Sequence, residues 1–179
     1  PGQQGETYVG FGGIGNRNGY YGAGGAGIIT CGMGGGGGYG AVGTHGSSQA
    51  WAGPNDNGYG GGIYGRADLE TLFFGSGGGG AGGSSDGSTG GDGGNGGGII
   101  FLAANTINWS GTIASNGILG SLMGTYPCGF HSGGAGGSIR IEAETFSNTG
   151  TVAASGTAYT VNGGMGAIGR IAVYYEDSF

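Results

Sequence analysis

The sequence contains no lysine and few charged residues of any kind. Charged residues make up 8% of the 179-residue chain, its four arginines are scattered, and the net charge is −6. A protein that binds DNA or RNA needs clustered Lys and Arg to neutralise phosphates, and an anionic membrane surface requires the same. We therefore expect no nucleic-acid partner and no attachment to an anionic membrane.

Proline is also scarce, and long apolar runs do not occur. Collagen combines one-third glycine with abundant proline in an unbroken Gly-X-Y repeat. Here 56 glycines accompany only 3 prolines, and the repeat is broken, which excludes collagen. No apolar run approaches the roughly 20 residues of a membrane-spanning helix, so no membrane insertion is expected.

The chain has only two cysteines, Cys31 and Cys128. They lie far apart in the sequence and lack the spacing of metal ligands. In an oxidising compartment they could form one disulfide, which would stabilise the fold by about 3–5 kcal/mol; the alternative is two buried thiols. Because the sequence begins at Pro1 without an initiator Met or a leader, we expect a processed product or a piece of a longer protein.

Glycine is what the chain has in abundance. Fixing a glycine costs about 0.5–1 kcal/mol more than fixing an alanine, so an ordered fold must gain something that only glycine permits. Close backbone packing with dense hydrogen bonding is the obvious gain. Many glycines fall at every third position, which is the repeat of polyproline-II-type helices. The runs are Gly34, Gly37, Gly40, Gly43 and Gly46; Gly87, Gly90, Gly93 and Gly96; and Gly163, Gly166 and Gly169.

Two interpretations of the glycine tracts stay open. One is a bundle of polyglycine-II helices docked on β-strands, and the other is irregular glycine loops over a β core. Apolar residues make up 36% of the chain and aromatic residues 11%, so there is material for a core in either case.

The second half of the chain contains a repeat. Residues 98–117 align without a gap with residues 137–156, an offset of 39 residues (98 to 137), and a truncated third copy follows at 169–175. Each copy alternates with period two, as a β-strand does. In the second copy Ile139, Ile141 and Ala143 point one way, whereas Arg140, Glu142 and Glu144 point the other way. A polar turn and a short second strand follow in each full copy, as in a coil of a β-solenoid.

We therefore predict a single all-β domain over residues 1–179. A glycine-rich part (1–97) would pack with β-solenoid-like repeat strands (98–179), and helix would be almost absent. The exception is residues 66–74, where Leu69, Leu72 and Phe73 have helical spacing and predict one or two helical turns beginning near Asp68.

The repeat copies "GGIIFLAANTINWSGTIASNG" and "GGSIRIEAETFSNTGTVAASG" resemble the repeats of filamentous-haemagglutinin-type secreted β-helices. The whole chain, with "YGRADLETLFFGSGGGG", "GGAGGSIRIEA" and "GRIAVYY", is similar to glycine-rich β-solenoid modules of large secreted bacterial surface proteins. The strand resemblance covers about 80 residues. It implies secretion, display at the cell surface and no catalysis.

Catalytic motifs are weak. The "GFGGIG" at residues 10–15 matches a dinucleotide-binding fingerprint, but the residues that follow are not helical, and without lysine there is no Walker A loop. His45 and His131 have no carboxylate or serine at motif spacing. Glu142 and Glu144 could act as an acid–base pair, but a solvated strand face explains them better. We expect no enzyme and no cofactor.

Three kinds of binding site remain as hypotheses. Asp86, Asp92 and Asn95 are calcium candidates, although their register does not fit the calcium-binding nonapeptide. Asn108 begins a glycosylation sequon. Tyrosines beside glycines could serve binding or self-association, their alternative role being coverage of the core. These tyrosines are Tyr20, Tyr21, Tyr39, Tyr59, Tyr64, Tyr174 and Tyr175.

The function expected from these features is that of an extracellular structural protein. It would be a self-assembling subunit or module of a surface filament, appendage or surface layer. The alternative is an adhesin, of a cell-surface or phage-tail type, that binds a glycan or a receptor. An ice-binding protein would need a flat face rich in Thr or Ala, and the "GTIAS" and "GTVAA" segments are too few for one.

Overall fold

The computed structural model describes residues 24, 27, 31–47, 57–83, 90–121, 131–157 and 162–177. All the regular secondary structure in these residues is strand, and no helix among them could cross a membrane. The strands are β1 (Ile99–Trp109), β2 (Thr112–Ala114), β3 (Ser138–Asn148), β4 (Thr151–Ala153) and β5 (Arg170–Asp177).

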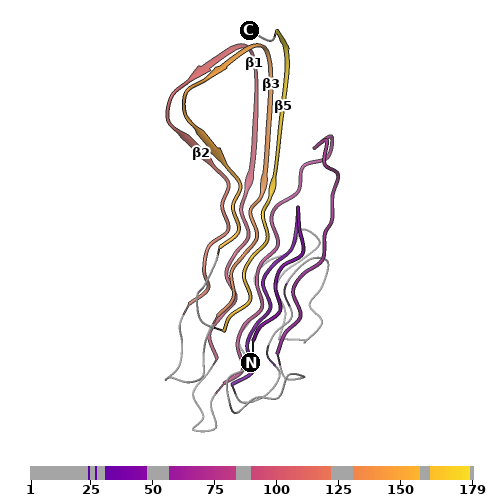
Figure 1. Cartoon of the computed structure of the whole chain (residues 1–179), viewed down its shortest axis with the longest axis vertical. Coiled ribbons are helices and arrows are strands. Elements are labelled where there is room, and N and C mark those ends of the chain that lie inside the picture. Colours follow the sequence, from indigo (N-terminus) through magenta and orange to yellow (C-terminus); the bar gives the residue numbers. More distant parts are fainter. Residues whose placement is uncertain are drawn as a thin grey trace.

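The strands form two parallel sheets, one in the order β1-β3-β5 and one of β2 beside β4. The pairing follows the repeat: Ile100 lies beside Ile139, and Thr112 lies beside Thr151, in both cases with the offset of 39. The third copy supplies β5, whose Ile171 lies beside Ile139. Figure 1 shows β1, β3 and β5 side by side, with the chain folding back through β2 from their far end.

The core of the strand half lies between the two sheets. Ile139 and Ile141 are wholly buried there with Ala154, as the alternation predicts, whereas Ala143 of the same predicted set is half-buried. Apolar residues from every strand pack against them; these are Ile100, Leu102, Ile107, Trp109, Ile113, Phe146, Val152 and Val173. The all-β expectation therefore holds for the described residues. Both sheets are open, with two edge strands each.

The glycine-rich segments are joined by backbone hydrogen bonds that repeat every third residue. From Gly133 to Gly137, successive amides donate to different neighbouring segments, and Gly136 and Gly137 return to the segments used three residues earlier by Gly133 and Gly134. Gly133 and Gly136 donate to Gly164 and Ala167; Gly134 and Gly137 donate to Ile118 and Ser115; and Ala135 donates to Ser76. This segment is therefore surrounded by backbone.

Segment 32–39 is surrounded in the same way, through its carbonyl groups. Neighbouring amides donate to it in three sets, each spaced by three residues. Gly58, Gly61 and Tyr64 donate to Met33, Gly36 and Tyr39; Gly164 and Ala167 donate to Gly34 and Gly37; and Gly82 and Gly79 donate to Gly32 and Gly35. The described glycine segments thus form an ordered frame of extended chains.

The frame is too tight for side chains at its contacts. A Cβ added at Gly36 would overlap the carbonyl group of Met165, and one added at Gly96 would overlap the carbonyl group of Gly75. These atoms are backbone and cannot rotate aside. Glycine is therefore required at such positions because two chains approach each other closely.

The frame and the sheet are continuous. Segments 90–98, 131–137 and 162–169 run directly into β1, β3 and β5, as the wavy lower chains in Figure 1 show. A second apolar core seals the junction around the wholly buried Tyr39 and Leu69. The Tyr39 hydroxyl lies 2.5 Å from the Ser138 hydroxyl, which links the frame to the first residue of β3.

The helical turns predicted for residues 66–74 are wrong. The segment is the tip of a long hairpin, with a turn at residues 67–68. Leu69 has a φ of 53°, in the left-handed region, which a right-handed helix does not allow. Tertiary contacts hold this conformation, since Leu69 is wholly buried in the junction core.

We expect Gly36→Ala to lower the free energy of unfolding by about 1–3 kcal/mol or more, because the added methyl group forces two backbones apart. The matched control is Gly62→Ala, since a Cβ there meets nothing within 4 Å. This control should be neutral or stabilise by about 0.4–1 kcal/mol. Denaturant unfolding of both variants measures the difference, and equal effects would contradict the tight-contact explanation.

Candidate functional site

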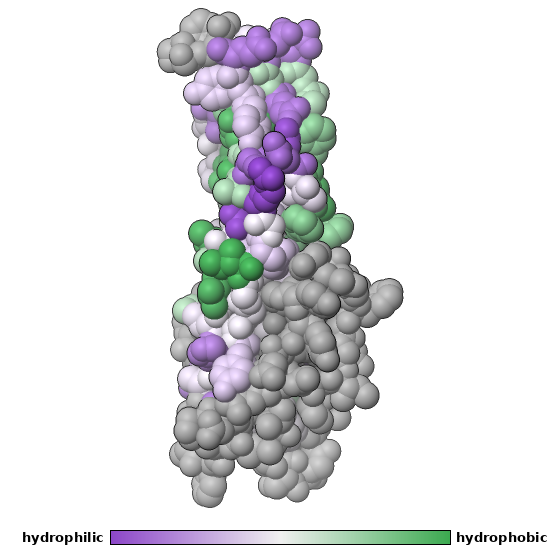
Figure 2. Space-filling model, turned by 90° about the vertical axis from the view of Figure 1, so that its right-hand side faces the viewer, coloured by the Kyte–Doolittle hydropathy of each residue, from purple (hydrophilic) through white to green (hydrophobic). Residues whose placement is uncertain are grey.

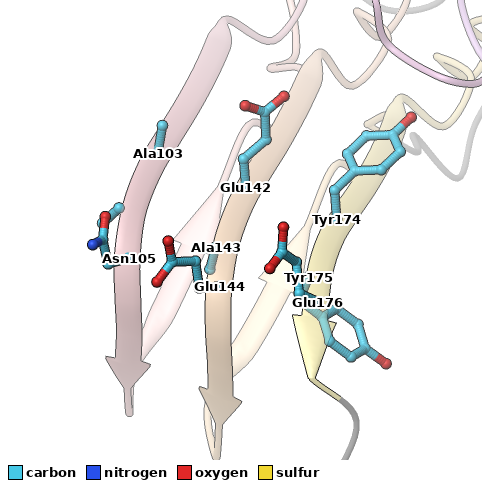
Figure 3. Close-up of a pocket in the computed structure, with 9 residues that line it drawn as sticks. Ala103, Asn105, Glu142, Ala143, Glu144, Tyr174, Tyr175 and Glu176 are labelled. Carbon is cyan, nitrogen blue, oxygen red and sulfur yellow. The ribbon is translucent and has the colours of Figure 1, made fainter.

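The outward face of β1, β3 and β5 carries a group of polar side chains. The register places Ala103, Glu142 and Tyr174 in one row across the sheet. Figure 3 shows Asn105, Glu144 and Glu176 in the next outward row. These rows line a shallow depression of about 570 Å³ that is open to solvent.

Arg140 is the cation beside these carboxylates, and it is engaged. Its guanidinium forms an ion pair with Glu142. It also lies 6.0 Å from the centre of the Phe101 ring and 5.1 Å from that of Tyr174, within the range of cation–π attraction. The face is therefore acidic and aromatic, and its one nearby positive charge is already neutralised.

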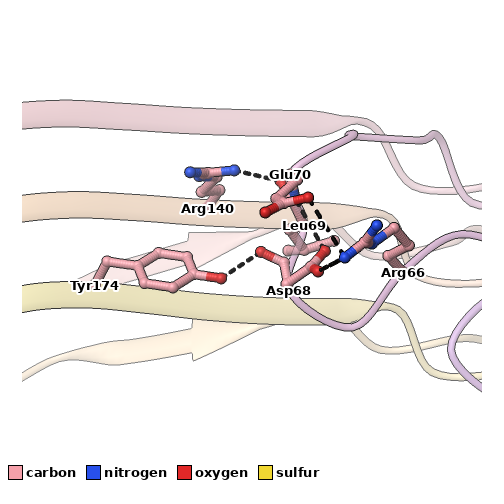
Figure 4. A network of polar contacts seen from close by, with 6 residues as sticks. All are labelled: Arg66, Asp68, Leu69, Glu70, Arg140 and Tyr174. Atoms are coloured by element: carbon pink, nitrogen blue, oxygen red, sulfur yellow. Dashed lines mark hydrogen bonds and ion pairs between the residues drawn. The ribbon is translucent and has the colours of Figure 1, made fainter.

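The tip of the hairpin docks at the start of this face (Figure 4). Arg140 donates to the Leu69 carbonyl at 2.7 Å, and the Tyr174 hydroxyl donates to the Asp68 carbonyl at 2.5 Å. Arg66 donates to the Asp68 carboxylate at 2.9 and 2.7 Å. This hydrogen bonding to Arg66 holds the pKa of the Asp68 carboxyl below its usual value. Polar contacts thus fix the hairpin to β3 and β5.

The side chains of this face can contact a polar partner. Its lining offers carboxylates, one amide and tyrosine rings, with no serine, cysteine or histidine that could act as a nucleophile beside a base. The depression is open, whereas small-molecule sites bury most of their ligand. Glu142 and Glu144 lie on one face, as the alternation predicts, and Glu142 is paired with Arg140.

The candidate tyrosines fall into different classes. Tyr59, Tyr174 and Tyr175 are exposed, and each ring also has a neighbour, which is His45, Arg140 and Phe146 respectively. Tyr39 is wholly buried, so its expected role as a contact residue is wrong: its ring completes the junction core. Tyr64 is partly buried against that core and donates to the Phe74 carbonyl. Tyr20 and Tyr21 lie outside the described residues.

The cysteine and calcium candidates are only partly described. Cys31 is disulfide-bonded, whereas Cys128 lies outside the described residues, so the pairing stays a prediction. Asp86 also lies outside them. The described part of the chain contains no group of three or more His, Cys, Asp or Glu residues that could hold a metal ion. The Asn95 carbonyl accepts from the amide of Ile118 within the frame.

The structure does not bring the remaining candidate residues that it describes together into one site. Asn108 is exposed on β1, so its sequon is accessible. His45 is exposed and accepts from the Gly60 amide at 2.9 Å. His131 is buried at the start of segment 131–138, on the frame side of the molecule. The "GFGGIG" stretch lies outside the described residues.

Sequence reasoning missed a set of exposed apolar side chains along the sheet edges. Ile99 and Phe101 on β1 are 36% and 51% exposed, and Ile171 on β5 is 43% exposed. In Figure 2 a hydrophilic band runs along the strand half with hydrophobic patches on both sides of it. Alternation alone could not reveal these residues, because exposure at an edge depends on the order of strands in the sheet.

Comparisons with known proteins add no relative to this description. A scan against protein-family models found no match, and searches of the curated proteins and of the solved structures found none either.

We expect the free energy of unfolding to fall as the pH is lowered from about 7 through 6.5. Burial lowers the pKa of His131 below its ordinary 6.5, and this effect outweighs a hydrogen bond with the Ser121 backbone. The unfolded chain therefore takes up this proton first, and stability is lost until the folded pKa is reached. Urea unfolding between pH 5 and pH 8 measures the slope. His131→Gln should flatten it, and an unchanged slope would contradict the assignment.

We expect Arg140→Met to release the hairpin tip from the sheet. The loss of these hydrogen bonds and of the ion pair should lower the free energy of unfolding by about 1.5 kcal/mol. This value is at the low end of the range for hydrogen bonds to a charged group, because the guanidinium is partly solvated. The matched control is Arg66→Met, whose exposed ion pairs contribute little. Amide hydrogen exchange over residues 66–73 should rise in Arg140→Met alone, and protection unchanged from the wild type would refute the docking role.

Proposed function

We propose that this chain is an extracellular structural protein, a self-associating subunit or module of a surface filament or layer. The observation that carries the proposal is the open parallel sheet, whose two edge strands β1 and β5 expose large apolar side chains. Unpaired edges of this kind pair with other chains unless something blocks them. Among the described residues, β1 and β5 contain no proline and no lysine, and the charged residues of β5 (Arg170, Glu176 and Asp177) lie at its two ends, so the middle of this edge is open to pairing.

The glycine frame supports a mechanical role. We infer that it is a polyglycine-II-type bundle, because its hydrogen bonds return to the same neighbour every third residue. Such a body is held by backbone contacts in several directions at once, so it resists bending and shear. The three described glycine segments that lead into strands would make the frame and the sheet one rigid unit.

The disulfide at Cys31 supports the extracellular location. Disulfides persist in oxidising environments and are rare in reducing ones. The scarcity of charge and the absence of lysine are also compatible with a protein whose surface is largely covered in an assembly.

An adhesin is the second candidate, and the outward face of β1, β3 and β5 favours it. Tyr174 and the carboxylates of Glu144 and Glu176 stand exposed on a rigid support, and sugar rings stack on tyrosine while their hydroxyls donate to carboxylates. Binding to a glycan array that is abolished by Tyr174→Ala together with Glu144→Gln would support this candidate.

The test of the structural function is the association state of the purified full chain. We expect sedimentation velocity at rising protein concentration to show growing assemblies, and negative-stain electron microscopy to show particles with a regular axial repeat. A chain that stays monomeric at high concentration, in oxidising buffer that preserves the Cys31 disulfide, would refute the proposal.

A further inference from the structure

We propose that copies of this chain join head to tail, with the open edge of β5 paired in parallel with the open edge of β1 of the next copy. The inference rests on the proposed self-association, and it specifies the two surfaces that meet and their register. The partner it commits to is a second copy of this chain.

The free edges have the backbone groups that such pairing needs. The sheet order β1-β3-β5 leaves the outer sides of β1 and β5 without a strand among the described residues. The Arg170 amide donates to Gly137, on the β3 side. Because amides of an extended strand alternate in direction, those of Ile171, Val173 and Tyr175 point to the open side. This edge can therefore donate to a new parallel strand.

Both edges carry exposed apolar side chains. On β1 they are Ile99 and Phe101, and on the β5 side they are Ile168, Ile171, Tyr174 and Tyr175. The central strand has no such residue, because Ile139 and Ile141 are wholly buried between their neighbours. Both edge strands therefore carry apolar side chains of the kind that a central strand buries, and no neighbouring strand among the described residues covers them.

A next β1 in the same register continues the columns that already cross the sheet. Within one copy, Ile100, Ile139 and Ile171 form one inward column. Leu102, Ile141 and Val173 form the following one. A new β1 in step would place its Ile100 beside Ile171 and its Leu102 beside Val173. Inward apolar contacts would then continue across the boundary between copies.

The outward and exposed positions are complementary in size and charge. In this register the bulky Tyr174 and Tyr175 would lie beside Ala103 and Ala104 of the next copy. Phe101 would lie beside the small Ala172. Glu176 would lie beside the neutral Asn105 and so meet no further carboxylate. Large residues thus face small ones, and no like charges are brought together.

A two-fold pairing of β5 with β5 fits these observations less well. It would leave Ile99 and Phe101 of β1 exposed. Arg170 would also not be free to neutralise a carboxylate of the partner copy. Its guanidinium already donates to the Tyr64 carbonyl and lies 5.4 Å from the centre of the Tyr39 ring. A β5-to-β1 contact uses different surfaces on the two copies, so it can repeat from copy to copy, and it produces a filament where the rotation between copies does not close a ring.

Cysteine cross-linking tests the register directly. The double variant Ala103→Cys with Tyr174→Cys is oxidised to disulfides and run without reductant, which leaves the Cys31 disulfide intact. A disulfide joins only thiols on adjacent strands, whereas the same two positions within one copy lie two strands apart, about 10 Å. We expect a ladder of covalent dimers, trimers and longer products on denaturing gels. The matched control, Asn108→Cys with Tyr174→Cys, places the first thiol five positions (103 to 108) further along β1, about 16 Å away. It should yield no ladder.

Each outcome separates this interface from the broader function. A ladder in the double variant, and only dimers when the two single variants are mixed, supports the head-to-tail contact. Dimers formed by Tyr174→Cys alone would indicate β5-to-β5 pairing and overturn it. Assemblies that sediment as in the wild type but give no ladder would overturn the interface and leave the structural function standing. Monomers under all conditions would overturn both.

A charge substitution tests the same edge without cysteines. Ile171→Lys places a charge on the open edge, which natural edges use to prevent pairing. Phe74→Lys is the matched control, because Phe74 is equally apolar and 56% exposed but lies on the hairpin. We expect Ile171→Lys to sediment as a folded monomer, checked by circular dichroism, and Phe74→Lys to assemble as the wild type does. Assembly by a folded Ile171→Lys chain would overturn the proposal.

Discussion

Backbone hydrogen bonding between glycine segments is the interaction on which the rest of this structure depends. Segments 32–39 and 131–138 are surrounded by neighbouring backbone, and side chains are excluded where the chains meet. Hydrogen bonds of this kind are directional and repeat every third residue. They can therefore offset the entropy lost by fixing glycine only if all the segments adopt the same extended geometry together. The frame is consequently cooperative: a methyl group at one contact disturbs chains on both sides.

The frame also decides where the strands lie. Segments 90–98, 131–137 and 162–169 are already aligned and parallel when they reach β1, β3 and β5. Parallel pairing of distant segments is costly in loop-closure entropy, and here the frame carries that cost before the strands begin. The Tyr39–Ser138 contact and the docked hairpin tip fix the junction between the two halves.

The parts of this fold that could be predicted from the sequence are those with a local repeat. The period-two alternation and the 39-residue repeat predicted the strand segments β1–β4, and the structure pairs them at the same offset of 39. The helical spacing at residues 66–74 misled, since Arg140 and the junction core fix that segment from outside. Burial of Tyr39 depends on Ser138, 99 residues away, and the exposed edges depend on strand order. No local sequence pattern predicts the burial of Tyr39 or the exposure of these edges.

A glycine frame restricts how such a protein can interact with other molecules. Where its described segments meet, backbone contacts leave no room for a Cβ. What the frame supports well is a rigid, repeated surface, and the described surface ends in two strand edges of the same direction and matching pattern. An edge left open on a flexible body would pair in several registers. On this frame the inward column of Ile100, Ile139 and Ile171 favours one register, because a slip of one residue would turn apolar side chains to solvent. The rigid frame therefore makes strand pairing at the open edges specific to one register.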